Sequence, residues 1–287
     1  VVLGFLEVAF AFKFLSIADQ TYHWGISDRD VFLSIWIVTF TFLGLYLLGK
    51  IRLPHDSPGD KIGVGRMMVA LTTFIFVIYL IPGMFGAPLK ALSGYLPPQN
   101  SHDFDLAQII RNNGGGSSGS GIDNAGTLCD LPRHAELLHL PHGLVGYFDI
   151  DQAKACSEET DKPIFVDFTG HGCVNCREME ANVWSDPRVL KILREEYVIV
   201  ALYVDDKTEL PEEDWFTSKY DDKVKKSIGK QNADFQIVQF NNNAQPYYCL
   251  LDSDGELLVT PKAYDLNIQN FIDFLKKGVE EFQKKAS

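Results

Sequence analysis

Residues 167–176 read DFTGHGCVNC and follow the apolar segment PIFV at 163–166. The apolar residues predict a buried strand, and a helix is expected to begin near the first cysteine. Cys173 and Cys176 would then lie on one face of that helix, where their sulfurs can form a disulfide. The stretch therefore predicts a dithiol redox centre at the junction of a strand and a helix.

The two cysteines are expected to play different parts. Backbone N–H groups at the start of the helix and the positive end of its dipole lower the pKa of a nearby thiol. Cys173, at the start, is the expected nucleophile, and Cys176 is the expected resolving thiol.

A Cys-x-x-Cys pair also supplies half of many structural zinc sites, and His171 stands nearby. A zinc site needs further ligands, but the sequence has no second Cys-x-x-Cys and no His-x-x-x-His. Cys129, Cys156 and Cys249 occur singly. We therefore expect a redox-active disulfide between Cys173 and Cys176 with no metal and no other cofactor, and a metal-binding module remains the alternative.

Asp167 is the first candidate for proton transfer. It lies six residues before Cys173, among apolar neighbours that predict burial. A partly desolvated carboxyl has a raised pKa and can exchange a proton with the resolving thiol. The structural alternative is an aspartate that caps the next helix.

These residues, followed by a helix that contains Glu180, resemble the thioredoxin superfamily. The longer run CVNCREMEANVWSDPRV, at 173–189, resembles the C-terminal domain of the DsbD-type thiol:disulfide interchange proteins. The resemblance covers about residues 143–285. It implies an α/β thioredoxin-like domain with a central mixed β-sheet flanked by helices, and a protein-disulfide reductase with Cys173, Cys176, Asp167 and Glu180 as catalytic residues. Glu180 could instead be a solvated helix residue.

The sequence departs from common thioredoxins around the cysteine pair. Gly172 stands where thioredoxins have Trp, and Val174 and Asn175 replace Gly-Pro between the cysteines. Because these residues help to set the thiol pKa, thioredoxin's reduction potential cannot be transferred. A disulfide oxidase or isomerase, or a thiol reductant of cytochrome c maturation, therefore remains an alternative.

A thioredoxin-like fold also calls for a proline, usually cis, packed against the cysteine pair, and Pro246 fits. Residues 245–251, a turn at 252–255 and residues 256–259 predict a hairpin. Backbone beside such a proline can bind an extended partner chain, although an edge-strand proline is the alternative. The expected substrate-binding residues are Pro246, Gln245, His171, Val174 and Asn175.

Other elements are expected around this centre. Residues 150–159 predict a helix, 197–204 a buried strand and 268–283 an amphipathic helix. The charged stretch 205–243 predicts a helical insertion. Cys129 and Cys156 could form a bridge or remain separate thiols, and Cys249 is expected in the core.

The N-terminal third predicts membrane helices. Residues 30–49 and 67–85 are apolar and long enough to span a bilayer, and 1–17 is a third candidate. The loop 50–66 carries four basic residues and is expected in the cytoplasm. We therefore expect about three transmembrane helices, with everything after about residue 90 outside the cytoplasm.

Residues 3–19 and 36–50 resemble the last spans of the DsbD membrane region. The resemblance implies a multi-pass protein of the bacterial inner membrane whose thioredoxin-like domain lies in the periplasm. The implied electron donor is the thiol-bearing part of its own membrane domain, fed by cytoplasmic thioredoxin, and the implied acceptors are extracytoplasmic thiol-disulfide proteins. No cysteine precedes Cys129 and the sequence starts with Val1, so a C-terminal fragment is expected.

Composition separates the parts of the chain. Residues 111–126 are rich in Gly and Ser, which predicts a flexible tether that either lets the domain shuttle or is inert. We expect a membrane region at 1–98, a linker at 99–140 and a thioredoxin-like domain at 141–287. Residues 1–100 hold seven basic and six acidic residues. The rest of the chain holds nineteen basic and thirty-two acidic residues. Because the C-terminal domain is acidic and nucleic acid is a polyanion, we do not expect nucleic acid as a partner.

Overall fold

The fold is described from a computed structural model, which covers residues 1–53, 62–102 and 128–286. The chain divides into two compact units. One comprises Val1–Gln20 and Trp24–Gly116, and the other comprises Thr21–His23 and Ser117–Ser287. Each unit is described by itself.

Three helices make up most of the first unit: α1 (Val2–Tyr22), α2 (Arg29–Leu47) and α3 (Val64–Leu80). The Asp19 carboxylate accepts hydrogen bonds from the backbone N–H groups of Ile26 and Ser27, which fixes the turn between α1 and α2. The Trp36 indole N–H donates to the carbonyl of Ala9 at 3.1 Å and so joins α2 to α1. These contacts join α1 to α2, and Leu80 of α3 packs in one cluster with Phe32 and Leu33 of α2.

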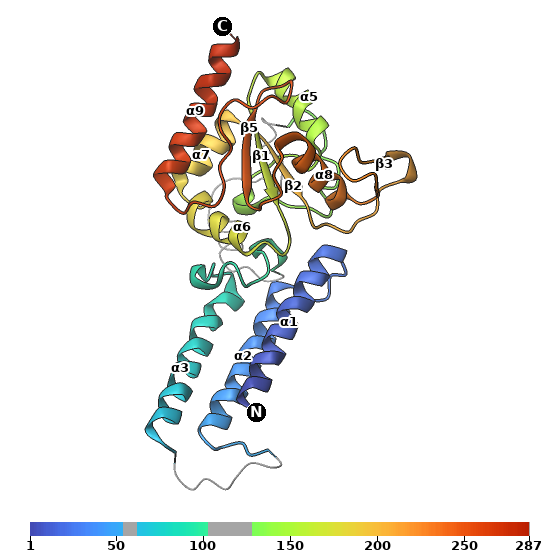
Figure 1. The fold of residues 1–287 in the computed structure, drawn as a ribbon. Helices are drawn as coiled ribbons and strands as arrows, with labels where there is room; N and C mark the ends of the chain where they lie inside the picture. The colour runs from blue at the N-terminus through green and yellow to red at the C-terminus, as the bar shows by residue number, and fades with distance from the viewer. Residues whose placement is uncertain (54–61, 103–127, 287) are drawn as a thin grey trace, which may run out of the picture. The chain divides into compact units, whose positions relative to one another are not determined.

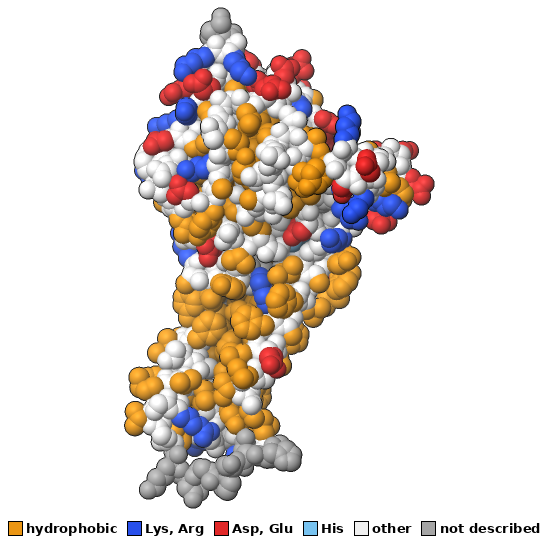
Figure 2. Space-filling view, viewed as in Figure 1, with side chains coloured by type: hydrophobic (Ala, Val, Ile, Leu, Met, Phe, Trp, Pro, Cys, Tyr) orange, Lys and Arg blue, Asp and Glu red, His pale blue; other side chains and the backbone are white. Residues whose placement is uncertain are grey.

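Two stretches, Arg29–Leu47 and Val64–Phe85, are long and apolar enough to cross a bilayer, by length and composition alone. They coincide with the spans expected at 30–49 and 67–85. The third expected span, 1–17, is helical but is not confirmed as a span, because Glu7, Lys13 and Asp19 interrupt α1. Figure 2 shows apolar side chains gathered over the N-terminal helices, where Phe14, Val64 and Ile78 are exposed.

The second unit is built on a three-stranded sheet of order β2-β1-β5. β1 (Ile164–Thr169) pairs in parallel with β2 (Val198–Tyr203) and antiparallel with β5 (Tyr247–Leu251). Every residue of β1 and β2 is buried, as their near-continuous apolar sequences predict. This confirms the expected mixed sheet.

Helices cover both faces of this sheet (Figure 1). Side chains alternate between the faces of a strand, so Phe165 and Phe168 of β1 enter different clusters. Phe165 packs with α7 (Pro187–Glu196) and α9 (Ile268–Ala286), and Phe168 packs with α5 (Ile150–Thr160) and α8 (Ile228–Phe240). The result is three layers, with the helices expected at 150–159 and 268–283 in place.

The stretch expected as a helical insertion, 205–243, is helical only in its second half, as α8. Its first half contains a short turn of helix, Glu212–Asp214, and two-residue strands β3 (Phe216–Thr217) and β4 (Val224–Lys225). Hydrogen-bonding and ion-pair contacts hold this half against α8, since Ser218 donates to Asp234 and the Lys225 ammonium lies 3.4 Å from the same carboxylate.

The hairpin predicted after residue 245 forms only in part. β5 is its first strand, but residues 256–259 are not a regular strand and make one bridge, Leu257 with Leu251. A further bridge joins Lys262 to Tyr248. The chain after the turn therefore follows β5 only at isolated points.

Residues 128–140, which the sequence assigns to the linker, pack on the C-terminal domain. A disulfide joins Cys129 to Cys156 of α5, and Leu138 is buried. The Tyr147 hydroxyl accepts a hydrogen bond from the Cys129 backbone N–H at 2.8 Å. The predicted tether at 111–126 lies outside the described residues, and the domain boundaries stay predictions.

Candidate active site

A disulfide between Cys173 and Cys176 lies where β1 leads into α6 (Val174–Met179). The two Cα atoms are 5.3 Å apart. Cys173 is the residue before the helix, and its sulfur accepts a hydrogen bond from the Cys176 backbone N–H at 3.1 Å. Cys173 is partly exposed, whereas Cys176 is only 1% exposed. An attacking thiol can reach Cys173 more easily, as the predicted roles require.

A depression of about 390 Å³ opens beside Cys173. Its lining includes Val174, Asn175 and Gln245, three of the predicted substrate-binding residues. The other two have different surroundings. Pro246 is buried at the start of β5 after a cis peptide bond, and the His171 ring packs on the Tyr203 ring with centroids 4.6 Å apart.

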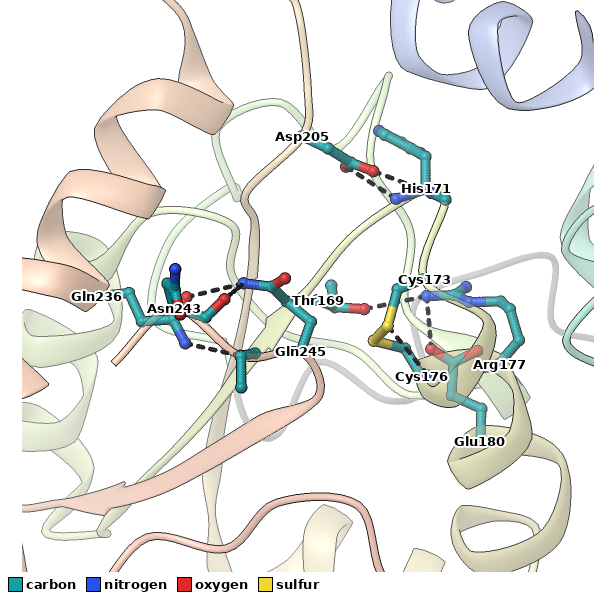
Figure 3. The surroundings of a disulfide bond; sticks show 12 residues. Thr169, His171, Cys173, Cys176, Arg177, Glu180, Asp205, Gln236, Asn243 and Gln245 are labelled. Carbon is teal, nitrogen blue, oxygen red and sulfur yellow. Dashed lines mark hydrogen bonds and ion pairs between the residues drawn. A yellow bond between two sulfur atoms is a disulfide. The ribbon is translucent and has the colours of Figure 1, made fainter. Parts of the chain in front are cut away.

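Asp205 anchors the loop that leads to Cys173. Its two carboxylate oxygens accept hydrogen bonds from the backbone N–H groups of His171 and Gly172, both at 2.9 Å (Figure 3). A side chain at Gly170 would place its Cβ 2.9 Å from the same carboxylate. Asp205 was not predicted from the sequence, although it lies two residues after β2, a buried strand parallel to β1. Carboxyl ends of parallel strands meet at one sheet edge, and that was the available signal.

Three buried charged side chains lie on the elements that flank the cysteine pair, Asp167 on β1 and Arg177 and Glu180 on the helical segments after Cys176. Asp167 is 3% exposed, Arg177 9% and Glu180 8%. The Arg177 guanidinium is 2.8 Å from the Glu180 carboxylate and donates to the Thr169 hydroxyl at 3.1 Å. Figure 3 shows Arg177 and Glu180 on the α6 side of the disulfide. Burial rules out the reading of Glu180 as a solvated helix residue.

The same burial changes the acidity of both carboxyls. Burial raises the pKa of Asp167 well above its usual value, the Glu180 charge adds to the effect, and Arg177 opposes it. Burial raises the pKa of Glu180 to about 6, again opposed by Arg177. Asp167 does not act as the cap of α6, a place that Cys173 takes. The sequence predicted a buried, weakly acidic Asp167 but not the role of Arg177.

Gln236 of α8 holds the loop that precedes Pro246. This side chain is fully buried, and its amide donates to the carbonyl of Ala244 at 2.8 Å. The Gln245 amide donates to the Gln236 side-chain oxygen at 3.1 Å and to the carbonyl of Asn243 at 2.9 Å. Gln236 has no sequence signature, because its partners lie across a loop.

The remaining cysteines stand apart from this site. Cys129 and Cys156 form the second disulfide, which settles the alternative that the sequence left open. Cys249 is a buried free thiol of β5, and burial raises its pKa. It is the core residue that the sequence predicted.

Part of the chain is similar to known proteins. Residues 146–253 match a family model described as thioredoxin-like. An oxidoreductase titled DsbH is 15% identical, with a TM-score of 0.37, and the match covers 59% of this chain and 98% of that one. A thioredoxin from Thermus thermophilus is 18% identical, with a TM-score of 0.34, covering 46% and 85%. No curated protein sequence matched. The family match and the sheet around Cys173 and Cys176 identify residues 146–253 as a thioredoxin-like domain.

Proposed function

We propose that the chain is a membrane-anchored protein-disulfide reductase that passes electrons through Cys173 and Cys176 to extracytoplasmic disulfide proteins. The observation that carries the proposal is the asymmetry of the pair. Cys173 is partly exposed beside a depression, whereas Cys176 is buried, four residues before the weakly acidic Glu180. This asymmetry supports a role for the Cys173 sulfur in meeting a partner and for the Cys176 sulfur in exchanging a proton away from solvent.

The reaction begins with the reduced pair. The Cys173 thiolate attacks one sulfur of the partner's disulfide, and the partner's other sulfur leaves as a thiolate and takes a proton. Cys176 then loses its proton to the Asp167 carboxylate and attacks the Cys173 sulfur, which releases the partner's second thiolate. Both partner thiolates take their protons from solvent, and the Cys176 proton stays on Asp167. Two electrons pass to the partner, and the Cys173–Cys176 disulfide forms.

A dithiol donor resets the domain by the reverse sequence. The donor thiolate attacks the Cys173–Cys176 disulfide, and Cys176 leaves and takes its proton from the Asp167 carboxyl. We propose as donor the thiol-bearing part of the membrane domain, fed by cytoplasmic thioredoxin. The apolar α2 and α3 support a membrane location, and the basic loop 50–66 supports a periplasmic domain.

Trapping tests the proposal. In the full chain in nanodiscs, Cys176→Ala leaves Cys173 without a resolving thiol, so we expect a stable mixed disulfide with an extracytoplasmic thiol protein. Mass spectrometry identifies that partner, including a cytochrome c maturation factor or an isomerase. Cys249→Ser is the matched control, because its thiol is buried in the core. Trapping that persists when Cys173→Ser is added would refute the assignment of the nucleophile.

A further inference from the structure

Arg177 brings a fixed positive charge into the site. It directly follows Cys176, and its guanidinium is protonated at every relevant pH. The side chain is nearly buried and reaches two elements, since it donates to Thr169 of β1 and contacts Glu180 of the π-helical segment Glu180–Trp184. Two carboxyls, Asp167 and Glu180, therefore share one buried cation.

The two carboxyls stand in different relations to this cation. The Glu180 carboxylate forms the direct ion pair at 2.8 Å, one helical turn from Arg177. Asp167 Oδ1 is buried and has no hydrogen-bond partner within 1–53, 62–102 and 128–286. Figure 3 shows the Arg177 guanidinium linked to Thr169 on one side and Glu180 on the other.

This difference in contacts decides which of the two carboxyls holds a proton. A buried carboxylate in direct contact with a guanidinium keeps its charge, whereas one without a partner loses solvation and favours its neutral form. The directions of the pKa shifts are compatible with this division, because burial raises the pKa of Glu180 to about 6 against the effect of Arg177, and the Glu180 charge adds to burial in raising the pKa of Asp167.

We infer that Arg177 is a positioning residue that holds Glu180 ionised and so assigns proton transfer at the cysteine pair to Asp167. The inference rests on the proposed function and deepens it. When the disulfide is reduced, the Asp167 carboxyl gives its proton to the Cys176 sulfur and becomes a carboxylate, and oxidation returns the proton. Glu180 gains and loses none.

Other titratable groups surround Arg177. Burial keeps Tyr203 of β2 and Tyr248 of β5 protonated, because it raises the pKa values of both hydroxyls far above neutral pH. His171, which precedes α6, packs its ring on Tyr203. His142, near the π-helical segment, contacts the Glu180 carbonyl at 2.7 Å.

Infrared difference spectroscopy of the full chain in nanodiscs tests the inference. Spectra of the oxidised protein at pH 7.5, each compared with the spectrum of its carboxyl variant, show which carboxyl is protonated. We expect one protonated-carboxyl band in the wild type, lost in Asp167→Asn and kept in Glu180→Gln. Arg177→Met should add a second band, which Glu180→Gln then removes, and Arg177→Lys should restore the single band. Arg188→Met is the control, since that guanidinium pairs with Asp186 at the surface.

Two outcomes overturn the inference. One is a second band that fails to appear in folded Arg177→Met. The other is a wild-type band that disappears in Glu180→Gln and survives in Asp167→Asn, and this comparison decides even if Arg177→Met does not fold. Neither reading needs a partner protein. Failure of the proposed function would show separately, as a wild type whose dithiol reduces no protein disulfide.

Discussion

At the scale of single residues, the chain places two identical thiols in unlike surroundings. The Cys173 sulfur accepts a hydrogen bond from the Cys176 backbone N–H, which favours its thiolate, while Cys176 is buried four residues before Glu180. Asp167 carries the consequence for pH. In the folded, oxidised domain its carboxyl stays protonated at a pH where the unfolded chain has ionised, so its burial costs stability that grows as pH rises above about 4.

Replacing Asp167 with Asn should therefore stabilise the domain at pH 8 and slow its chemistry. The gain should be present at pH 8 and disappear below about pH 4, because Asn has no proton to lose. Resolution of the mixed disulfide should slow by about 10²-fold or more. Thermal unfolding in nanodiscs at both pH values and stopped-flow exchange measure the two effects. A gain independent of pH would contradict the buried-acid account.

Replacing Asp205 with Ala should loosen the loop before Cys173. Two backbone N–H groups, those of His171 and Gly172, lose their acceptor, at a cost of about 1 to 3 kcal/mol. Exchange at Cys173 should slow because the nucleophile is less well positioned. Asp254→Ala, at an exposed turn, is the matched control. Unchanged amide hydrogen exchange in residues 170–173 would show that Asp205 does not hold the loop.

At the scale of elements, alternation along β1 decides which group meets which layer. Asp167 shares a face with Phe165, on the side of α7 and α9, because both are odd positions of one strand. The parallel pairing of β1 with β2 brings Thr169 and Asp205 to the same sheet edge as the disulfide. α8 then adds Gln236, which holds the loop before Pro246 from the opposite face.

Gln236→Ala should weaken partner binding more than thiol chemistry. The variant leaves the Ala244 carbonyl and the Gln245 amide without one partner each, so the loop that lines the depression loosens. We expect KM for a protein disulfide to rise several-fold while the pH dependence of Cys173 alkylation stays the same. Gln269→Ala, on the exposed face of α9, should change neither. A shift in the Cys173 alkylation profile would mean that Gln236 acts on the thiol itself.

The sequence predicted the elements that a local pattern specifies. Apolar runs gave β1 and β2, the spacing of Cys173 and Cys176 gave the site, and Pro246 was expected before a strand. It missed Asp205 and Gln236 because their partners lie across loops or about 30 residues away in the chain, and no short pattern reports such contacts. Arg177 was missed because a charged residue in a helix predicts exposure, and only the tertiary structure shows its burial.

At the scale of the whole molecule, composition separates an apolar helical unit from an acidic thioredoxin-like domain. Two helices of the first unit are long and apolar enough to span a bilayer, and the loop between them carries basic residues. This pattern supports the proposed orientation, with Cys173 outside the cytoplasm and Arg52 inside.

Thiol labelling of intact cells tests that orientation. After reduction, Cys173 should react with a membrane-impermeant maleimide added outside cells whose outer membrane has been permeabilised. A cysteine introduced as Arg52→Cys, in a chain with Cys173→Ser, should react only after lysis. Labelling of Arg52→Cys in intact cells together with protection of Cys173 would contradict the proposed topology and indicate the opposite orientation.

The most direct test of the central claim is the equilibrium of the Cys173–Cys176 pair with glutathione, measured on the full chain in nanodiscs. Thiol alkylation and mass spectrometry give the fraction reduced at each glutathione ratio, with Cys249→Ser as the background so that only one titrating pair is counted beside the Cys129–Cys156 disulfide. A disulfide reductase requires a reduction potential below about −200 mV, and we predict a potential in that range for the Cys173–Cys176 pair. A potential near about −120 mV, typical of a strong disulfide oxidant, would contradict it.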